Sequence, residues 1–283
     1  MRLRVVLAAF AALAILAAVG IYAVVHSLSS GLPIKLPPTQ ECVVTTAGGV
    51  ARLEPEQMAN AATIAAVGIR RALPTQAIVV ALATASQESK LQNLGGGDRD
   101  SVGLFQQRPS QGWGTPDQLM DPHYATKKFY DALLKVKGWQ NLPVEQAAQA
   151  VQKSADGSLY ARWDDRSRIL AAALTGEAAG AVGCTIVDQP AQRGATAAAA
   201  LVEGVTADWG EVRTVDRTGL MGLALAVDAP RTGWQYAHWL VSHAADRNIR
   251  SVRFGDQVWT ANAAKWNRSD APTPDQVVAE VYD

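Results

Sequence analysis

A helix that is apolar on nearly every side constrains this chain more than any other feature. Pro74 and Thr75 can open a helix, and residues 76–89 continue it with an entirely apolar portion at residues 78–83. A helix without a polar face is stable only when other elements surround it. We therefore expect residues 76–89 to form a buried helix at the centre of a folded domain.

The rest of the chain is predicted to form two domains that differ in secondary structure. At 283 residues the chain is long enough for both. Residues 42–187 are expected to be mainly α, without a convincing strand, and residues 188–195 form a linker. Residues 196–283 are expected to form a small α+β accessory domain in which Gly255-Asp256 is the turn of a β-hairpin. The other predicted helices cover residues 53–71, 116–119, 122–136, 144–154, 162–174, 196–205 and 233–246.

An apolar segment close to the N-terminus predicts attachment to a membrane. Residues 5–25 carry no charge, and about 20 such residues at about 1.5 Å each span a hydrocarbon core of about 30 Å. Because Arg2 and Arg4 precede the segment, its N-terminus is expected in the cytoplasm. We predict a single-pass transmembrane helix as a signal anchor over residues 1–26 and an extracytoplasmic linker over residues 27–41. A cleaved signal peptide, which would give a secreted protein, is the alternative, although its apolar core is usually shorter.

The two cysteines of the chain, Cys42 and Cys184, predict a disulfide. An even cysteine count in an exported protein favours pairing. These two cysteines bracket the predicted helical domain, so their bond would join its two ends. Two unrelated buried thiols are the alternative.

Composition and spacing exclude several classes of function. Lysine and arginine (26) balance aspartate and glutamate (26), so bulk charge gives no reason to expect nucleic-acid binding. His123, His238 and His243 do not have the spacing of metal ligands, and we expect them at the surface or at helix ends. Neither a metal nor an organic cofactor is predicted.

Two motifs follow the buried helix in an informative order. Glu88-Ser89 ends the helix, Gly-Leu-Phe-Gln-Gln-Arg-Pro occupies residues 103–109, and Gly-Trp-Gly occupies residues 112–114. This arrangement resembles the active site of lysozyme-like lytic transglycosylases and goose-type lysozymes, in the form common in actinobacterial and phage-related members. Across residues 53–163 the resemblance implies a lysozyme-like domain that cleaves peptidoglycan glycan strands. The family more often has methionine where this chain has Phe105.

The chemistry of glycan cleavage gives Glu88 a role. The departing oxygen needs a proton, which a carboxyl group can supply when its surroundings favour the protonated form. Burial at the end of an apolar helix acts in that direction, and so does the negative end of the helix dipole. The resemblance implies that Glu88 acts as the single acid and then as the base, at the β-1,4 bond between N-acetylmuramic acid and N-acetylglucosamine. An isolated glutamate is ordinarily an exposed surface residue, which is the alternative.

The resemblance also implies a set of residues that bind the substrate. The family's Ala-Tyr-Asn segment corresponds to Ala150-Val151-Gln152, so Gln152 takes the place of asparagine and the tyrosine is missing. Tyr160 is expected to supply an aromatic hydroxyl instead. The complete predicted substrate-binding set is Ser101, Gln106, Gln107, Trp113, Gln152 and Tyr160.

Asp98 and Asp100 lie near the position where goose-type lysozymes keep assisting aspartates. In that role they would activate water and make the protein a hydrolytic lysozyme. Aspartates that follow glycines are also ordinary turn residues, which is the interpretation we favour.

The sequence as a whole thus predicts a membrane-anchored, extracytoplasmic enzyme that acts on peptidoglycan glycan strands. A non-catalytic cell-wall binding or scaffold protein is the alternative from another functional class. The tryptophans of the accessory domain would form its core, as expected for Trp234 and Trp259, or bind wall glycans or an envelope protein.

Overall fold

The computed structural model describes residues 15–23, 26 and 39–283. The chain divides into two units, residues 1–38 and residues 39–283, and each is described by itself. In the first unit, residues 15–23 form a helix. No helix in the described part of the chain is both long and apolar enough to cross a membrane. The predicted anchor extends over residues 1–14 and 24–25, which lie outside the described residues.

The centre of the second unit is the apolar helix α3 (Thr75–Ser89). Its residues 77–86 are buried, since α3 packs against four other helices. These are α2 (Pro55–Arg70), α5 (Pro122–Leu133), α6 (Val144–Gln152) and α7 (Asp164–Leu174). The central buried helix predicted from the sequence is therefore confirmed. Shorter helical segments complete this part, namely η1 (Pro109–Gln111), α4 (Pro116–Leu119), η2 (Trp139–Asn141) and η3 (Gly157–Trp163).

A three-stranded antiparallel sheet lies against these helices, in the order β2-β1-β3. Strand β1 (Glu41–Thr46) pairs with β2 (Gly49–Leu53) through a two-residue turn, and with β3 (Val182–Thr185) on its other side. Cys42 stands directly opposite Cys184 in the β1–β3 register, and the two form a disulfide. The predicted disulfide is confirmed.

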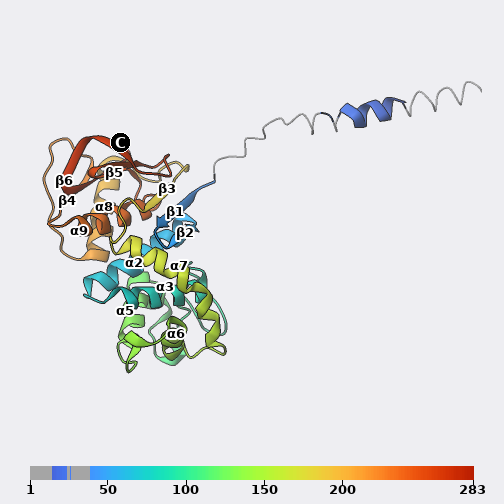
Figure 1. Cartoon of the computed structure of the whole chain (residues 1–283), viewed down its shortest axis with the longest axis vertical. Helices are drawn as coiled ribbons and strands as arrows, with labels where there is room; N and C mark the ends of the chain where they lie inside the picture. Colours follow the sequence, from blue (N-terminus) through green and yellow to red (C-terminus); the bar gives the residue numbers. More distant parts are fainter. Residues whose placement is uncertain (1–14, 24–25, 27–38) are drawn as a thin grey trace, which may run out of the picture. The chain divides into compact units, whose positions relative to one another are not determined.

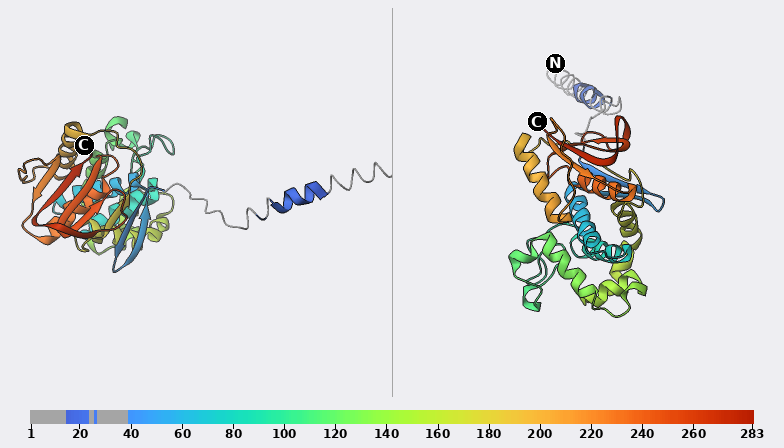
Figure 2. Two further views of the ribbon diagram at one scale, coloured as in Figure 1. Left: turned by 90° about the horizontal axis from the view of Figure 1, so that it is seen from above. Right: turned by 90° about the vertical axis from the view of Figure 1, so that its left-hand side faces the viewer.

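The second sheet has the order β4-β6-β5 and is also antiparallel. Its strands are β4 (Gly222–Ala226), β5 (Ile249–Thr260) and β6 (Asn267–Val281), and α8 (Gly194–Trp209) and α9 (Pro230–Ser242) pack against them. Figures 1 and 2 show these five elements on one side of the unit and helices α3, α5 and α6 on the other.

The hairpin predicted at Gly255-Asp256 is wrong. Strand β5 runs through both residues, and its pairing with β6 shifts in register on either side of Gly255. Gly255 has a φ of +59°, which glycine adopts without steric cost, and the result is an irregularity within the strand. The chain reverses after Thr260 instead and returns as β6.

The predicted fold class, a mainly α lysozyme-like domain and a small α+β domain preceded by a transmembrane helix, is also wrong. The stretch expected to lack strands contains β1, β2 and β3, and the described residues contain no helix able to span a membrane. Strands β1 and β2 alternate buried and less buried positions with the period of two that a half-buried strand requires, as in Cys42 and Val44 of β1, whereas Val182, Gly183 and Cys184 of β3 are all buried.

Residues 39–283 form a single compact unit, and side chains cross between its two halves. Trp259 Nε1 donates to the carbonyl oxygen of Cys184, and Trp266 Nε1 donates to that of Val182. Trp234 and Trp259 are both buried, as expected for core residues. The boundary predicted at residues 188–195 lies inside this unit and stays a prediction.

The expectation of surface or helix-end positions is wrong for His238, which lies inside α9, whereas His243 does end that helix, although its side chain is buried. His238 is fully buried, and both of its ring nitrogens have partners. Its Nδ1 bonds to the carbonyl oxygen of Ala173, and its Nε2 accepts from the amide of Ala181. His243 is buried beside Asp208, a carboxylate that also contacts His123. Both ring nitrogens of His238 are thus committed to the main chain.

Candidate active site

Glu88 occupies the last turn of α3, where the helix ends in a left-handed residue, Lys90 (φ +58°). Its side chain is half-buried and lines a cleft of about 600 Å³. Of the predicted substrate-binding residues, five line the same cleft: Ser101, Gln106, Gln107, Trp113 and Gln152.

Tyr160, the sixth predicted binding residue, is buried beneath the cleft and holds Glu88. Its hydroxyl donates a hydrogen bond to Glu88 Oε1 at 2.5 Å. Burial raises the pKa of Tyr160, and the hydrogen bond to Glu88 raises it further, so the hydroxyl stays a donor. The other carboxylate oxygen, Oε2, has no hydrogen-bond partner within residues 39–283. One oxygen of Glu88 is thus fixed by the protein and the other is left for a ligand.

The loop after α3 is anchored to the helix that carries Glu88. Ser89 Oγ donates to the carbonyl oxygen of Leu104 at 2.7 Å, and Gln152 Nε2 donates to that of Phe105 at 2.7 Å. The buried Phe105 ring stacks on Phe129 with 4.6 Å between the ring centroids. Gln152 therefore lies in the cleft wall with its amide donor engaged by the main chain.

Two glycines of this loop make close approaches, and at Gly103 the backbone itself requires glycine. A Cβ on Gly97 would stand 1.7 Å from Gln106 Oε1, and Gln106 Nε2 in turn donates to the carbonyl oxygen of Gly103. Gly103 has a φ of +79°, and a Cβ there would stand 2.2 Å from the carbonyl oxygen of Leu119. The glycines allow the loop to bring Gln106 into the cleft wall.

Gln107 presents an unpaired acceptor. The side chain is only 2% exposed, and its Nε2 donates to the carbonyl oxygen of Ala125 at 3.2 Å. Its Oε1 is buried without a hydrogen-bond partner among the described residues. Because an unpaired buried acceptor is costly, Oε1 is suited to accept from an N–H or O–H group of a ligand.

Trp113 is half-buried in the cleft wall, and its carbonyl oxygen accepts from the hydroxyl of Tyr124 at 3.3 Å. A Cβ on the next residue, Gly114, would stand 2.8 Å from the Tyr124 ring. Tyr124 thus fixes the main chain that carries the indole, whose flat face can pack on a sugar.

The two predicted assisting aspartates have different surroundings. Asp98 is exposed and lines the cleft. Asp100 does not line the cleft, and both of its carboxylate oxygens are engaged. Its Oδ2 accepts from the amide of Ser110 at 2.8 Å and its Oδ1 from Arg108 Nε at 2.7 Å. The Ser110 hydrogen bond and the Arg108 guanidinium hold the pKa of Asp100 far below its usual range. Asp100 thus has the contacts of a turn residue, and it positions Arg108, which does line the cleft.

Sequence comparison adds no relative to this description. Models of protein families give no match to the chain, and a search of curated proteins gives none either. Within the described residues, no group of three or more His, Cys, Asp or Glu side chains is arranged to hold a metal ion.

Proposed function

We propose that the protein cleaves peptidoglycan glycan strands at the bond between N-acetylmuramic acid and N-acetylglucosamine, as a lytic transglycosylase with Glu88 as its acid and base. The observation that carries the proposal is the placement of Glu88. Its carboxyl group is half-buried, held on one oxygen by Tyr160 and open on the other to a cleft of about 600 Å³. The motifs at residues 103–109 and 112–114, which resemble those of the transglycosylases, support the same assignment.

The proposed reaction uses Glu88 twice. The protonated carboxyl group gives its proton to the glycosidic oxygen, the bond from that oxygen to C1 of the muramic unit breaks, and positive charge develops at the ring. The Glu88 carboxylate then takes the proton of the C6 hydroxyl of the same sugar, whose oxygen bonds to C1. No water is consumed, and the product ends in an anhydro sugar. Tyr160 stabilises the intermediate carboxylate by donating to Oε1.

The cleft wall supplies groups suited to the N-acetyl sugars. The unpaired Oε1 of Gln107 can accept from an acetamido N–H, and Trp113 can pack on a sugar ring. Ser101, Gln106 and Gln152 also line the cleft, of which Gln152 acts mainly by holding the loop at Phe105.

An extracytoplasmic location follows from the same proposal, because peptidoglycan lies outside the cytoplasm. The disulfide between Cys42 and Cys184 supports it, since structural disulfides persist chiefly in oxidising compartments.

The proposal is tested by comparing the full-length protein with its Glu88→Gln variant on insoluble peptidoglycan. The substitution keeps size and polarity but removes the proton that the reaction needs. We expect the wild type to release soluble glycan and the variant to release less than about one hundredth as much, while both still sediment with the wall material. Binding without release by the wild type would favour the non-catalytic wall-binding alternative and would contradict the proposal.

A further inference from the structure

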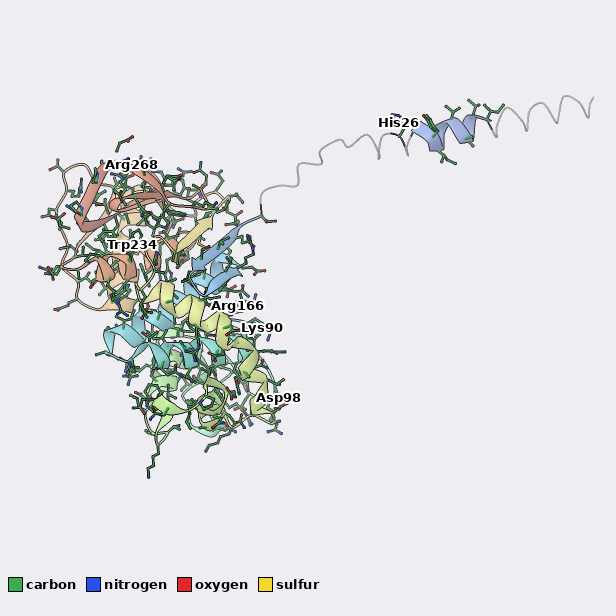
Figure 3. The ribbon with its side chains drawn as sticks, in the orientation of Figure 1. His26, Lys90, Asp98, Arg166, Trp234 and Arg268 are labelled. Atoms are coloured by element: carbon green, nitrogen blue, oxygen red, sulfur yellow. A yellow bond between two sulfur atoms is a disulfide. The ribbon has the colours of Figure 1, made fainter. Side chains whose placement is uncertain are left out.

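Three cationic side chains surround one indole beside the catalytic helix. Lys90 Nζ lies 4.7 Å from the centre of the Trp163 ring, Arg162 Cζ lies 5.4 Å from it and Arg166 Cζ lies 5.7 Å from it. We call these four residues the Trp163 cluster. They come from the end of α3, from η3 and from α7, and Figure 3 shows Lys90 and Arg166 next to each other.

The cluster is joined to the wall of the cleft through Gln87, which lines the cleft next to Glu88. Gln87 Oε1 accepts from Arg162 Nη2 at 2.7 Å and from Trp163 Nε1 at 2.9 Å. Tyr160, which holds Glu88, belongs to the same short helix as Arg162 and Trp163. None of the four cluster residues lines the cleft itself. The cluster adjoins the cleft wall through Gln87, and Lys90 is close enough to Glu88 for their charges to interact.

The three cations of this cluster have no ion-pair partner among the described residues, and the carboxylate whose charge acts on Lys90 is Glu88 of the cleft. The neighbouring Asp164 pairs with Arg168 at 2.7 Å. Like charges that share a small surface repel one another. The cluster is therefore suited to receive an anionic group.

Donors also remain free in the cluster. Arg166 Nη2 donates to the carbonyl oxygen of Arg52 at 2.8 Å, but Arg166 Nε is buried without a partner among the described residues. Arg162 is exposed and uses Nη2 for Gln87. Guanidinium groups bind carboxylates through paired N–H donors, so these two arginines match a carboxylate in chemistry as well as in charge.

We propose that the Trp163 cluster binds a carboxylate carried on the lactyl arm of the muramic unit, so that the protein selects acidic glycan strands. This inference rests on the proposed function. N-acetylglucosamine has no ionised group, whereas each muramic unit bears a lactyl ether that ends in a carboxylate or continues into a peptide with carboxylates of its own. The shared chemistry is the carboxylate, and the cluster recognises it beside the bond that Glu88 cleaves.

The experiment compares three forms of one strand preparation: strands with intact peptides, strands stripped by an amidase to free lactyl groups, and strands whose carboxylates are converted to neutral amides. The variants are Arg162→Gln and Lys90→Gln, with Arg162→Lys to retain the charge. Arg268→Gln is the matched control, because Arg268 is an exposed arginine of β6 outside the cluster. All are made in the full chain, and kcat/KM for glycan release is measured.

We expect the wild type and Arg268→Gln to prefer a carboxylate-bearing strand over the amidated one by about tenfold or more. Arg162→Gln and Lys90→Gln should lose most of this preference, chiefly through KM, and Arg162→Lys should retain part of it. A preference for stripped strands places the carboxylate on the lactyl group, and a preference confined to intact strands places it on the peptide. Either result supports the inference.

Equal cleavage of amidated and carboxylate-bearing strands by the wild type would overturn the inference and leave the proposed function intact. So would a preference that survives in both glutamine variants. Failure of the proposed function has a different signature, since the wild type would then release nothing from any strand. In that event, binding still tests the cluster. The Kd of each of the three strand preparations is measured for Glu88→Gln and for the double variant Glu88→Gln/Arg162→Gln. An equal Kd for stripped and amidated strands, and for intact and amidated strands, would overturn it.

Discussion

At the scale of single residues, the contact between Tyr160 and Glu88 sets the geometry of the proposed reaction. A carboxyl group at the end of a helix can adopt several rotamers, and the hydrogen bond from a fully buried tyrosine selects one of them. The same donor stabilises the carboxylate that forms when Glu88 has given up its proton. Position and charge of the carboxylate thus depend on one hydroxyl group.

Tyr160→Phe tests this dependence. The ring remains in its buried site, but Glu88 loses its donor, and we expect kcat/KM for glycan release to fall by about 10-fold to 100-fold. The matched control is Tyr130→Phe, which removes another buried hydroxyl, the donor to the carbonyl oxygen of Ile64. The control should lose about 1 kcal/mol of unfolding free energy and keep its activity. Unchanged release by Tyr160→Phe would show that Glu88 does not need the contact.

Asp98 is the cleft residue that would turn the protein into a hydrolase, because Asp100 is engaged by Arg108 and Ser110. Single-glutamate chemistry requires no second carboxylate, so we expect Asp98→Asn to release glycan at a rate within about twofold of the wild type. Product analysis by mass spectrometry should find the same ends from both proteins. A loss of activity in Asp98→Asn, with hydrolysed ends from the wild type, would instead identify Asp98 as the group that activates water.

The residues of the site were predictable where a motif carries them. The motifs predicted Glu88 and the cleft positions of Gln106, Gln107 and Trp113, because these residues lie close together in the sequence around one helix and its loop. The sequence contains no local signal for the pairing of Asp100 with Arg108. It also gives none for the Trp163 cluster, whose members come from elements that only the fold brings together.

At the scale of secondary-structure elements, helices were predictable and strands largely were not. The buried helix at residues 76–89 and the helix at residues 122–136 follow from the spacing of apolar side chains, which repeats over several turns. Strands β1 and β2 span six and five residues, too short for such a repeat to be decisive. Strand β6 carries Pro272 and Pro274, which argue against a strand in a sequence considered alone.

The disulfide between β1 and β3 has a measurable role at this scale. It joins residues 142 positions apart, and loss of such a crosslink costs about 4 to 5 kcal/mol in the chain-entropy model. We expect the double variant Cys42→Ala/Cys184→Ala to lose unfolding free energy of this order in urea titrations. None of the strands of that sheet lines the Glu88 cleft, so release of glycan at low temperature should persist. Equal unfolding midpoints for the two proteins would contradict this role.

At the scale of the whole molecule, His238 links α9 to the segment that leads into β3. Its ring bonds to the main chain at Ala173 and Ala181, and burial lowers its pKa to about 4. A histidine with a depressed folded pKa favours the native state while it is neutral. Its contribution is therefore complete above the unfolded pKa of about 6.5 and is lost as the pH falls from there toward 4.

Nuclear magnetic resonance of the imidazole groups tests this contribution. We expect the ring of His238 to remain neutral at about pH 5, where an ordinary histidine is charged. The unfolding free energy should fall with decreasing pH below about 6.5, with up to about 1.4 kcal/mol per pH unit from this group. Titration of His238 near pH 6.5 in the folded protein would contradict its place in the core.

The central claim, that Glu88 acts alone as acid and then as base, is tested most directly by digesting peptidoglycan in water enriched in oxygen-18. Mass spectrometry of the strands released by the wild-type protein should find anhydro ends, each one water lighter than a hydrolysed end and without the heavy isotope. Oxygen-18 in the new reducing ends, or release by Glu88→Gln at the wild-type rate, would contradict it.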